Sequence, residues 1–192
     1  IAAEHLGAIA KHIIDNGWVL RDKDGEPTRW GRWDPEYLQR PYGFESIGLN
    51  GMEAQTYMWT AWKLTGDDQF QKGLQQLLRW RYDQYTVREK LTFPPESVVP
   101  WDDELAFRCF LPLVTYCDDP RLRSIYVRAL ARHWEVLRRQ QVPYFNFLYG
   151  GITGHDCESA EAVQHLREWS LDTVSYSFRN SHRADLAQGR EY

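Results

Sequence analysis

Apolar side chains recur with the spacing of an α-helix along most of this chain. One such pattern ends at Asn16-Gly17, a pair typical of a helix C-terminus. The helical patterns cover residues 2–16, 48–65, 68–85, 105–116, 120–137 and 159–169. They predict an all-α protein.

Two of the predicted helical hairpins align with each other without a gap. The turn at 65–68 falls on the turn at 117–120, an offset of 52 residues (117 − 65). The same offset places Asn50 on Asp102 and Gly51 on Asp103. This is an internal repeat of helical hairpins, with a period slightly above that of most solenoids. Because equivalent helix starts share one rim of stacked hairpins, we expect the turn from Asn50 to Glu53 and the turn from Asp102 to Glu104 to face the same side.

The stretch after the first helix has a different character. Residues 18–20 are extended, and Asp22 to Gly25 have the composition of a tight turn. We then expect a long aromatic and basic loop over residues 27–35. It contains Arg29 and Arg32, which could hold a carboxylate, and Trp30 and Trp33, which could stack on a ring. A packed surface loop is the alternative interpretation.

A second aromatic stretch, residues 145–156, is rich in glycine, and we expect it to be a loop. Tyr149 and His155 lie in it, as does Asn146. Near the end of the chain, three polar side chains that could act in a site lie within four positions: Asn180, His182 and Arg183. That segment is either part of a site or a solvated chain end.

Composition narrows the function classes. With 192 residues, 43% of them hydrophobic, the chain fits one globular domain over 1–192. A formal net charge of −4 argues against a nucleic-acid partner, and no apolar run is long enough for a membrane span. Three cysteines without paired spacing predict neither a disulfide framework nor a zinc site, and we expect no metal or cofactor. No signal peptide is seen; a cytoplasmic or periplasmic location and the oligomeric state both stay open.

The most informative stretch runs from Trp101 to Leu111. Asp102, Asp103 and Glu104 follow the tryptophan, and we place these acids at the N-cap and first turn of a helix. The apolar stripe of that helix is expected to contain Leu105, Phe107, Cys109, Phe110, Leu111 and Leu113. The acids could be a simple cap. Closely spaced carboxylates also repel one another, so that one can keep its proton as a general acid.

Repeated helical hairpins with a Thr-Gly-Asp turn resemble the six-hairpin glycosidases, which are (α/α)6 toroids. Trp101, Asp103, Leu105 and Phe107 match the spacing of a helix start in unsaturated glucuronyl hydrolases. The resemblance implies that Asp103 is the proton donor. It also implies aromatic and Gly-rich loops on one rim, with sugar stacking on Trp30 and Trp33.

This sequence departs from that family in two respects. Asn50 stands where those enzymes carry an Asp, so Glu53 would take the second acidic role. Cys109-Phe110-Leu111-Pro112 replaces their Pro-Phe-Leu. Six hairpins of this length also need more residues than the chain has, which predicts a partial toroid belonging to a larger barrel.

Three functions stay open. The first is a glycoside hydrolase acting on uronic-acid-containing oligosaccharides. Asp103 would be its acid, Glu53, Asp102 or Glu104 the partner, and Asp103→Asn should abolish turnover without unfolding the protein. Its substrate-binding candidates are Arg29, Arg32, Arg183, Trp30, Trp33, Trp101, Asn50, Tyr149, His155 and Asn180.

The second is a polysaccharide lyase on the same fold. It would use Asn146, Tyr149, His155, Asn180, His182 and Arg183. The third is a non-catalytic helical-repeat module that binds carbohydrate or protein.

Overall fold

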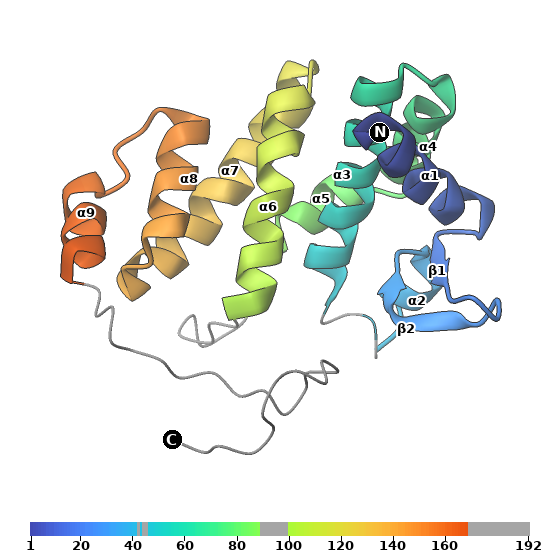
Figure 1. Cartoon of the computed structure of the whole chain (residues 1–192), viewed down its shortest axis with the longest axis horizontal. Coiled ribbons are helices and arrows are strands. Elements are labelled where there is room, and N and C mark those ends of the chain that lie inside the picture. The colour runs from blue at the N-terminus through green and yellow to red at the C-terminus, as the bar shows by residue number, and fades with distance from the viewer. Residues whose placement is uncertain (42, 44–45, 89–99, 169–192) are drawn as a thin grey trace.

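The computed structural model describes residues 1–41, 43, 46–88 and 100–168 (Figure 1). In these ranges the chain is mostly helical, as the periodicity predicts. The elements are α1 (Ala2–Asp15), β1 (Val19–Arg21), β2 (Pro27–Arg32), α2 (Pro35–Leu38), α3 (Ile47–Thr65), α4 (Asp68–Arg79), α5 (Tyr82–Thr86), α6 (Pro100–Tyr116), α7 (Pro120–Leu137), η2 (Arg138–Gln140), α8 (Pro143–Thr153) and α9 (Ser159–Glu168). Asn180, His182 and Arg183 lie outside the described residues.

The predicted aromatic loop after α1 is instead a β-hairpin. β1 and β2 pair antiparallel, with Val19 opposite Arg32. The turn forms because the Asp22 carboxylate accepts hydrogen bonds from the backbone N–H groups of Asp24 and Glu26, both at 2.9 Å. Gly31 permits the close pairing, since a Cβ there would lie 2.3 Å from the Cβ of Leu20.

Both predicted helical turns are confirmed. Gly66 ends α3 in the left-handed conformation, and the Asp67 side chain caps α4. Asp119 caps α7 by accepting from two backbone N–H groups, and Pro120 occupies the first helical position. The predicted helix 68–85 is wrong in one respect. It breaks at Arg81, whose φ is 66°, and resumes as α5.

The residues expected to form a glycine-rich loop at 145–156 instead form most of α8. Pro143 begins this helix, and Gly154 ends it with φ of 71°. Position 150 inside this helix needs a glycine, because the chain after the helix folds back against it and leaves no room for a side chain. A Cβ there would lie 2.5 Å from the Cys157 sulfur.

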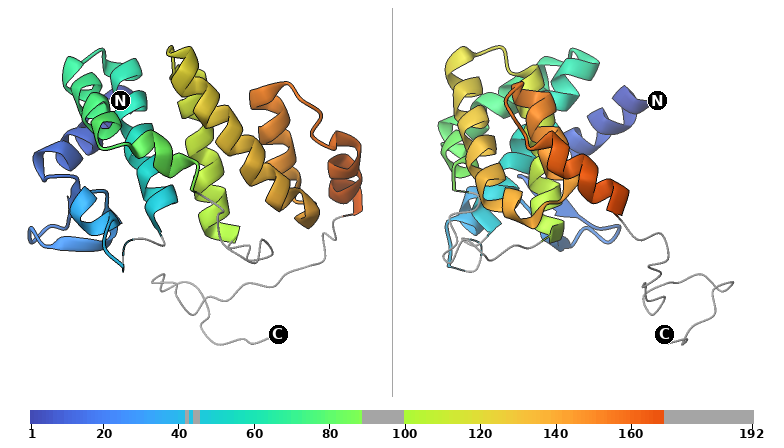
Figure 2. Two further views of the ribbon diagram at one scale, coloured as in Figure 1. Left: turned by 180° about the vertical axis from the view of Figure 1, so that it is seen from behind. Right: turned by 90° about the vertical axis from the view of Figure 1, so that its left-hand side faces the viewer.

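Three helices point the same way. α3, α6 and α8 each begin at the lower end of Figure 1, and α3 contacts α6, which in turn contacts α8. The rear view shows α4, α5 and α7 on the other face of this row, and α7 packs against α6 and α8 (Figure 2). α9 packs against α8 at one end of the row, and α1 crosses α3 at the other. The first turns of α3 and α6 therefore lie at the same end of the molecule.

One hydrophobic cluster joins residues from α1 to α8. Most of the predicted apolar stripe of α6 is confirmed, because Phe107, Cys109, Phe110 and Leu113 are buried. The prediction is wrong for Leu105 and Leu111, since both are exposed, and Ala106 and Val114 are buried in addition. No helix in the described part of the chain combines the length and the apolar character that crossing a bilayer requires.

Candidate functional site

The end of the β-hairpin is fixed against α3 and α5 by side chains from both helices. Asn50 of α3 donates from Nδ2 to the Arg32 carbonyl oxygen at 2.8 Å. The Tyr82 hydroxyl of α5 donates to the Trp33 carbonyl oxygen. The Trp33 backbone N–H donates to the Trp18 carbonyl oxygen at 2.9 Å. Trp33, only 4% exposed, is thereby held beside the first turns of α3.

This anchoring brings the Trp33 indole to Glu53. The indole Nε1–H donates to Glu53 Oε2 at 3.0 Å. Burial raises the pKa of the Glu53 carboxyl; the indole hydrogen bond lowers it, and the negative charge of Asp102 raises it again. The net effect is a raised pKa, so Glu53 keeps its proton to higher pH than an ordinary glutamic acid.

Tyr57 lies one helical turn after Glu53 in α3, on the side that faces the hairpin. Its ring packs edge-on against Trp33, with centroids 5.4 Å apart. Burial, followed by the nearby charges of Glu53 and Cys109, raises the pKa of the Tyr57 hydroxyl. The Glu53 carboxyl therefore bonds the Trp33 indole of the hairpin and interacts with the Tyr57 hydroxyl of α3 and with Asp102 of α6.

The three consecutive acids of α6 point in three directions. Asp102 is exposed and lies close enough to raise the pKa of Glu53. Glu104 pairs with Arg108 one turn further along the helix. Asp103 is 0% exposed, and its Oδ1 lies 3.0 Å from Nε2 of His133 on α7. Asp102 and Asp103 lie in the first turn of α6, and Glu104 follows them; because the helix starts earlier, at Pro100, none of the three is its N-cap.

The burial of Asp103 bears directly on the proton-donor role that the resemblance implies for it. Phe107 and Phe110 pack against the His133 ring, with centroids 5.1 and 6.0 Å away. The Asp103–His133 pair is thus enclosed in the core between α6 and α7. Asp103 is fully buried in this arrangement, and the contact that its carboxylate makes with His133 joins α6 to α7.

Adjacent acids therefore give a matched pair of variants. Asp103→Asn is expected to cost about 1–3 kcal/mol of unfolding free energy, because an amide places a donor group where a buried carboxylate only accepts. Asp102→Asn, on the exposed side, should change stability by less than about 0.5 kcal/mol. Urea denaturation of both variants measures the difference. Equal stabilities would contradict a structural role for Asp103, and the expectation that Asp103→Asn leaves folding intact would return.

The arginines and tryptophans proposed to bind substrate differ in how far they are exposed and free to contact a ligand. Arg32 is engaged, since its Nε lies 3.2 Å from Asp34 Oδ2 and its guanidinium lies over Tyr37. Arg29 is exposed and lies over the Trp30 ring at 5.0 Å. Trp30 is 78% exposed, and Trp101 at the start of α6 is 72% exposed. Arg29 and these two indoles can therefore meet a ligand.

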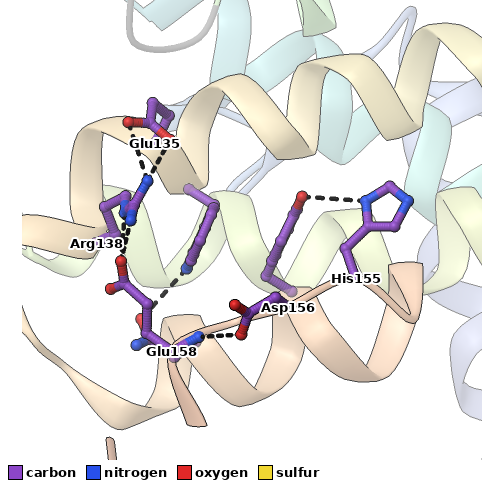
Figure 3. Close-up of polar contacts among 8 residues, drawn as sticks. Glu135, Arg138, His155, Asp156 and Glu158 are labelled. Atoms are coloured by element: carbon purple, nitrogen blue, oxygen red, sulfur yellow. Dashed lines mark hydrogen bonds and ion pairs between the residues drawn. The ribbon is translucent and has the colours of Figure 1, made fainter. Parts of the chain in front are cut away.

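The residues proposed for a lyase gather elsewhere. Tyr149 stacks on Trp134 at 4.2 Å, and its hydroxyl lies 3.2 Å from His155 Nδ1 (Figure 3). The Asn146 side chain accepts a hydrogen bond from the Trp134 indole at 3.2 Å. His155 follows the C-terminal end of α8, opposite the end where α3 and α6 begin (Figure 1). The structure brings these lyase candidates to one another and not to Glu53.

Arg138 belongs to the same cluster, which is the second one and also contains Trp134, Asn146, Tyr149 and His155. The Arg138 guanidinium bonds Glu135, three positions earlier in α7, and Glu158 in the connection between α8 and α9 (Figure 3). The same guanidinium lies over the Trp134 ring. Asp156 accepts from the Glu158 backbone N–H at 3.1 Å. Each of these groups has a partner within the cluster, which holds α9 onto the end of the helix row.

No set of three or more His, Cys, Asp or Glu side chains in the described ranges is placed to hold a metal ion. Two residues near the described clusters were not singled out by sequence reasoning. Tyr57 could have been found, because it is four positions after Glu53 on a helix that the periodicity predicts. His133 gives no local signal, since its partner Asp103 lies 30 positions away.

Comparison of the chain with protein-family models, with curated proteins and with solved structures found no match. The geometry around Glu53 therefore has to support any functional assignment by itself.

Proposed function

We propose that this chain is part of a glycoside hydrolase that acts on uronic-acid-containing oligosaccharides, with Glu53 as general acid and Asp102 as the partner carboxylate. The observation that carries the proposal is the state of Glu53. Its carboxyl is held by the Trp33 indole, largely desolvated, and close enough to Asp102 for the two groups to interact.

These properties match what glycoside hydrolysis needs. One carboxyl group must keep a proton to give to the leaving oxygen, and a second must act as base or nucleophile from the other side. Burial and the charge of Asp102 favour the protonated form of Glu53. Asp102 is exposed at the same end of the helix row, where water and substrate can reach it.

The proposal assigns the substrate contacts to exposed aromatic and basic side chains. Trp101 adjoins Asp102, and Trp30 lies on the hairpin; both offer a ring face on which a sugar can stack. Arg29, exposed beside Trp30, is the cation that we assign to the carboxylate of a uronic acid.

The same proposal extends to the fold. We infer that the α3–α4, α6–α7 and α8–α9 pairs are hairpins of an (α/α) toroid of the six-hairpin glycosidase type. The common direction of α3, α6 and α8, with α4, α5 and α7 behind them, supports this inference (Figures 1 and 2). In such a toroid the helix starts carrying Glu53 and Asp102 would open on one rim.

An absorbance assay tests the proposed function. The purified protein is incubated with unsaturated uronyl oligosaccharides, and we expect the ultraviolet absorbance of the unsaturated sugar to disappear as reducing ends are released. Intact polyuronide is the second substrate. A rise in absorbance on it would replace the proposal by a lyase. Saturable binding without turnover of either substrate would replace it by a non-catalytic binding module.

A further inference from the structure

Trp33 is held more firmly than its place beside a surface hairpin requires. Its backbone N–H bonds Trp18 and its carbonyl accepts from Tyr82. Its ring is buried and packs edge-on against Tyr57. Since both the backbone and the ring are fixed, the direction of the indole N–H is fixed as well. That single donor points at Glu53 Oε2.

We propose that Trp33 is the positioning residue of this site: its indole N–H holds one oxygen of the Glu53 carboxyl, so that the other is presented to the bound sugar. The inference rests on the proposed function for its catalytic meaning. The positioning itself is a property of the free protein and can be measured without a substrate.

The chemistry of the donor explains why a tryptophan suits this task. An indole N–H can donate but cannot accept, so it does not take the proton of the acid. It bonds the carboxyl in both protonation states, and more strongly in the charged one, because charge-assisted hydrogen bonds are the stronger kind. Trp33 thus opposes burial and keeps Glu53 able to release its proton and regain it.

Burial and the charge of Asp102 on α6 act on the same carboxyl in the opposite direction, because both favour the protonated acid. Tyr57, one turn along the same helix, is a further titratable group near this carboxyl, and the Tyr57 hydroxyl also interacts with Cys109 of α6. None of these supplies the fixed donor that the geometry assigns to Trp33. Removing the indole N–H should therefore leave burial and Asp102 unopposed.

The first test uses the folded protein and a conservative variant. With ¹⁵N-labelled protein, the Trp33 indole resonance is followed across pH and assigned by its absence in Trp33→Phe. We expect it to shift with the titration of Glu53 in the wild type and to be independent of pH in Glu53→Gln, which retains an oxygen acceptor. An indole resonance that does not respond to Glu53 would overturn the inference.

The second test separates positioning from packing. Trp33→Phe keeps an aromatic ring and deletes the donor. We expect the ¹³C resonance of the Glu53 carboxyl to titrate at higher pH than in the wild type, the alkaline limb of the hydrolysis profile to move the same way, and kcat to fall about 10–100-fold. Trp134→Phe, which alters a buried ring stacked on Tyr149 in the second cluster, is the control and should leave that titration unchanged.

The two failures can be told apart. If Trp33→Phe leaves the Glu53 titration where it was, the positioning role is wrong whatever the activity. If the titration moves but no uronyl oligosaccharide is hydrolysed by the wild type, Trp33 still positions Glu53, and the proposed reaction is the part that fails.

Discussion

Glu53→Gln is expected to lower hydrolysis by about 10²–10⁴-fold and, at neutral pH, to make the protein more stable than the wild type. Glutamine has nearly the shape of glutamic acid and still offers an oxygen to the Trp33 indole. It cannot donate a catalytic proton, and it removes the cost of ionising a buried carboxyl. We expect a gain of about 0.5–2 kcal/mol in unfolding free energy.

The sign of this effect follows from the raised pKa of Glu53. Between the pKa of the unfolded chain and the higher pKa of the folded state, the native protein binds more protons than the unfolded one. The stabilisation by protonated Glu53 is complete below the unfolded pKa and is lost as pH rises through the folded pKa. Wild type and Glu53→Gln should therefore converge in stability at acid pH and separate as pH rises.

Urea denaturation of both proteins at a series of pH values measures this separation, alongside the turnover assay. Asp102→Asn is the matched control: besides burial, the Asp102 charge raises the pKa of Glu53, so without it the loss of stability should be smaller and should be complete at a lower pH than in the wild type. A Glu53→Gln variant that is inactive and less stable than the wild type at neutral pH would identify Glu53 as a structural residue.

Local patterns predicted the helices and their turns because the governing interactions are short-range. Asp67 and Asp119 bond backbone groups two or three positions away, and Gly66 adopts a conformation that its own geometry favours. The offset between the two hairpins also led to Glu53 and Asp102 together. The structure places both at the end where α3 and α6 begin.

The errors concern side chains and glycines whose roles depend on distant partners. Three consecutive acids look alike in a sequence, and His133, far along the chain, decides that Asp103 turns inward. Gly31 and Gly150 suggest loops, yet each lies in a regular element. Glycine is needed at these positions because another segment, at Leu20 or at Cys157, approaches too closely for a side chain. Such contacts cannot be read from local composition.

Gln55→Leu is expected to be among the most destabilising single changes in the described part of the chain. Gln55 is fully buried in α3, and its Nε2 donates to the carbonyl oxygens of Gly51 and Tyr82 at 2.8 and 2.9 Å. It also donates to Thr86, and its Oε1 accepts from the Tyr126 hydroxyl at 2.7 Å. One amide thus connects α3 with α5 and α7.

Leucine fills a similar volume but forms none of these bonds. The Tyr126 hydroxyl and the Tyr82 carbonyl would lose this partner in the core, at about 1–3 kcal/mol each, so we expect a loss of about 3–5 kcal/mol in all. Gln75→Leu, at an exposed position of α4, is the control and should stay within about 0.5 kcal/mol of the wild type. Equal urea midpoints for the two leucine variants would contradict the network.

A double-mutant cycle with Tyr126→Phe shows whether the bonds act together. Because both changes disrupt the same hydrogen bond, their combined cost should fall short of the sum by about 1–2 kcal/mol. The network also reaches the candidate site. Gln55 holds the backbone of Tyr82, whose hydroxyl in turn anchors the carbonyl of Trp33, the residue whose indole bonds Glu53. Gln55→Leu should therefore broaden or shift the Trp33 indole resonance, whereas Gln75→Leu should leave it in place.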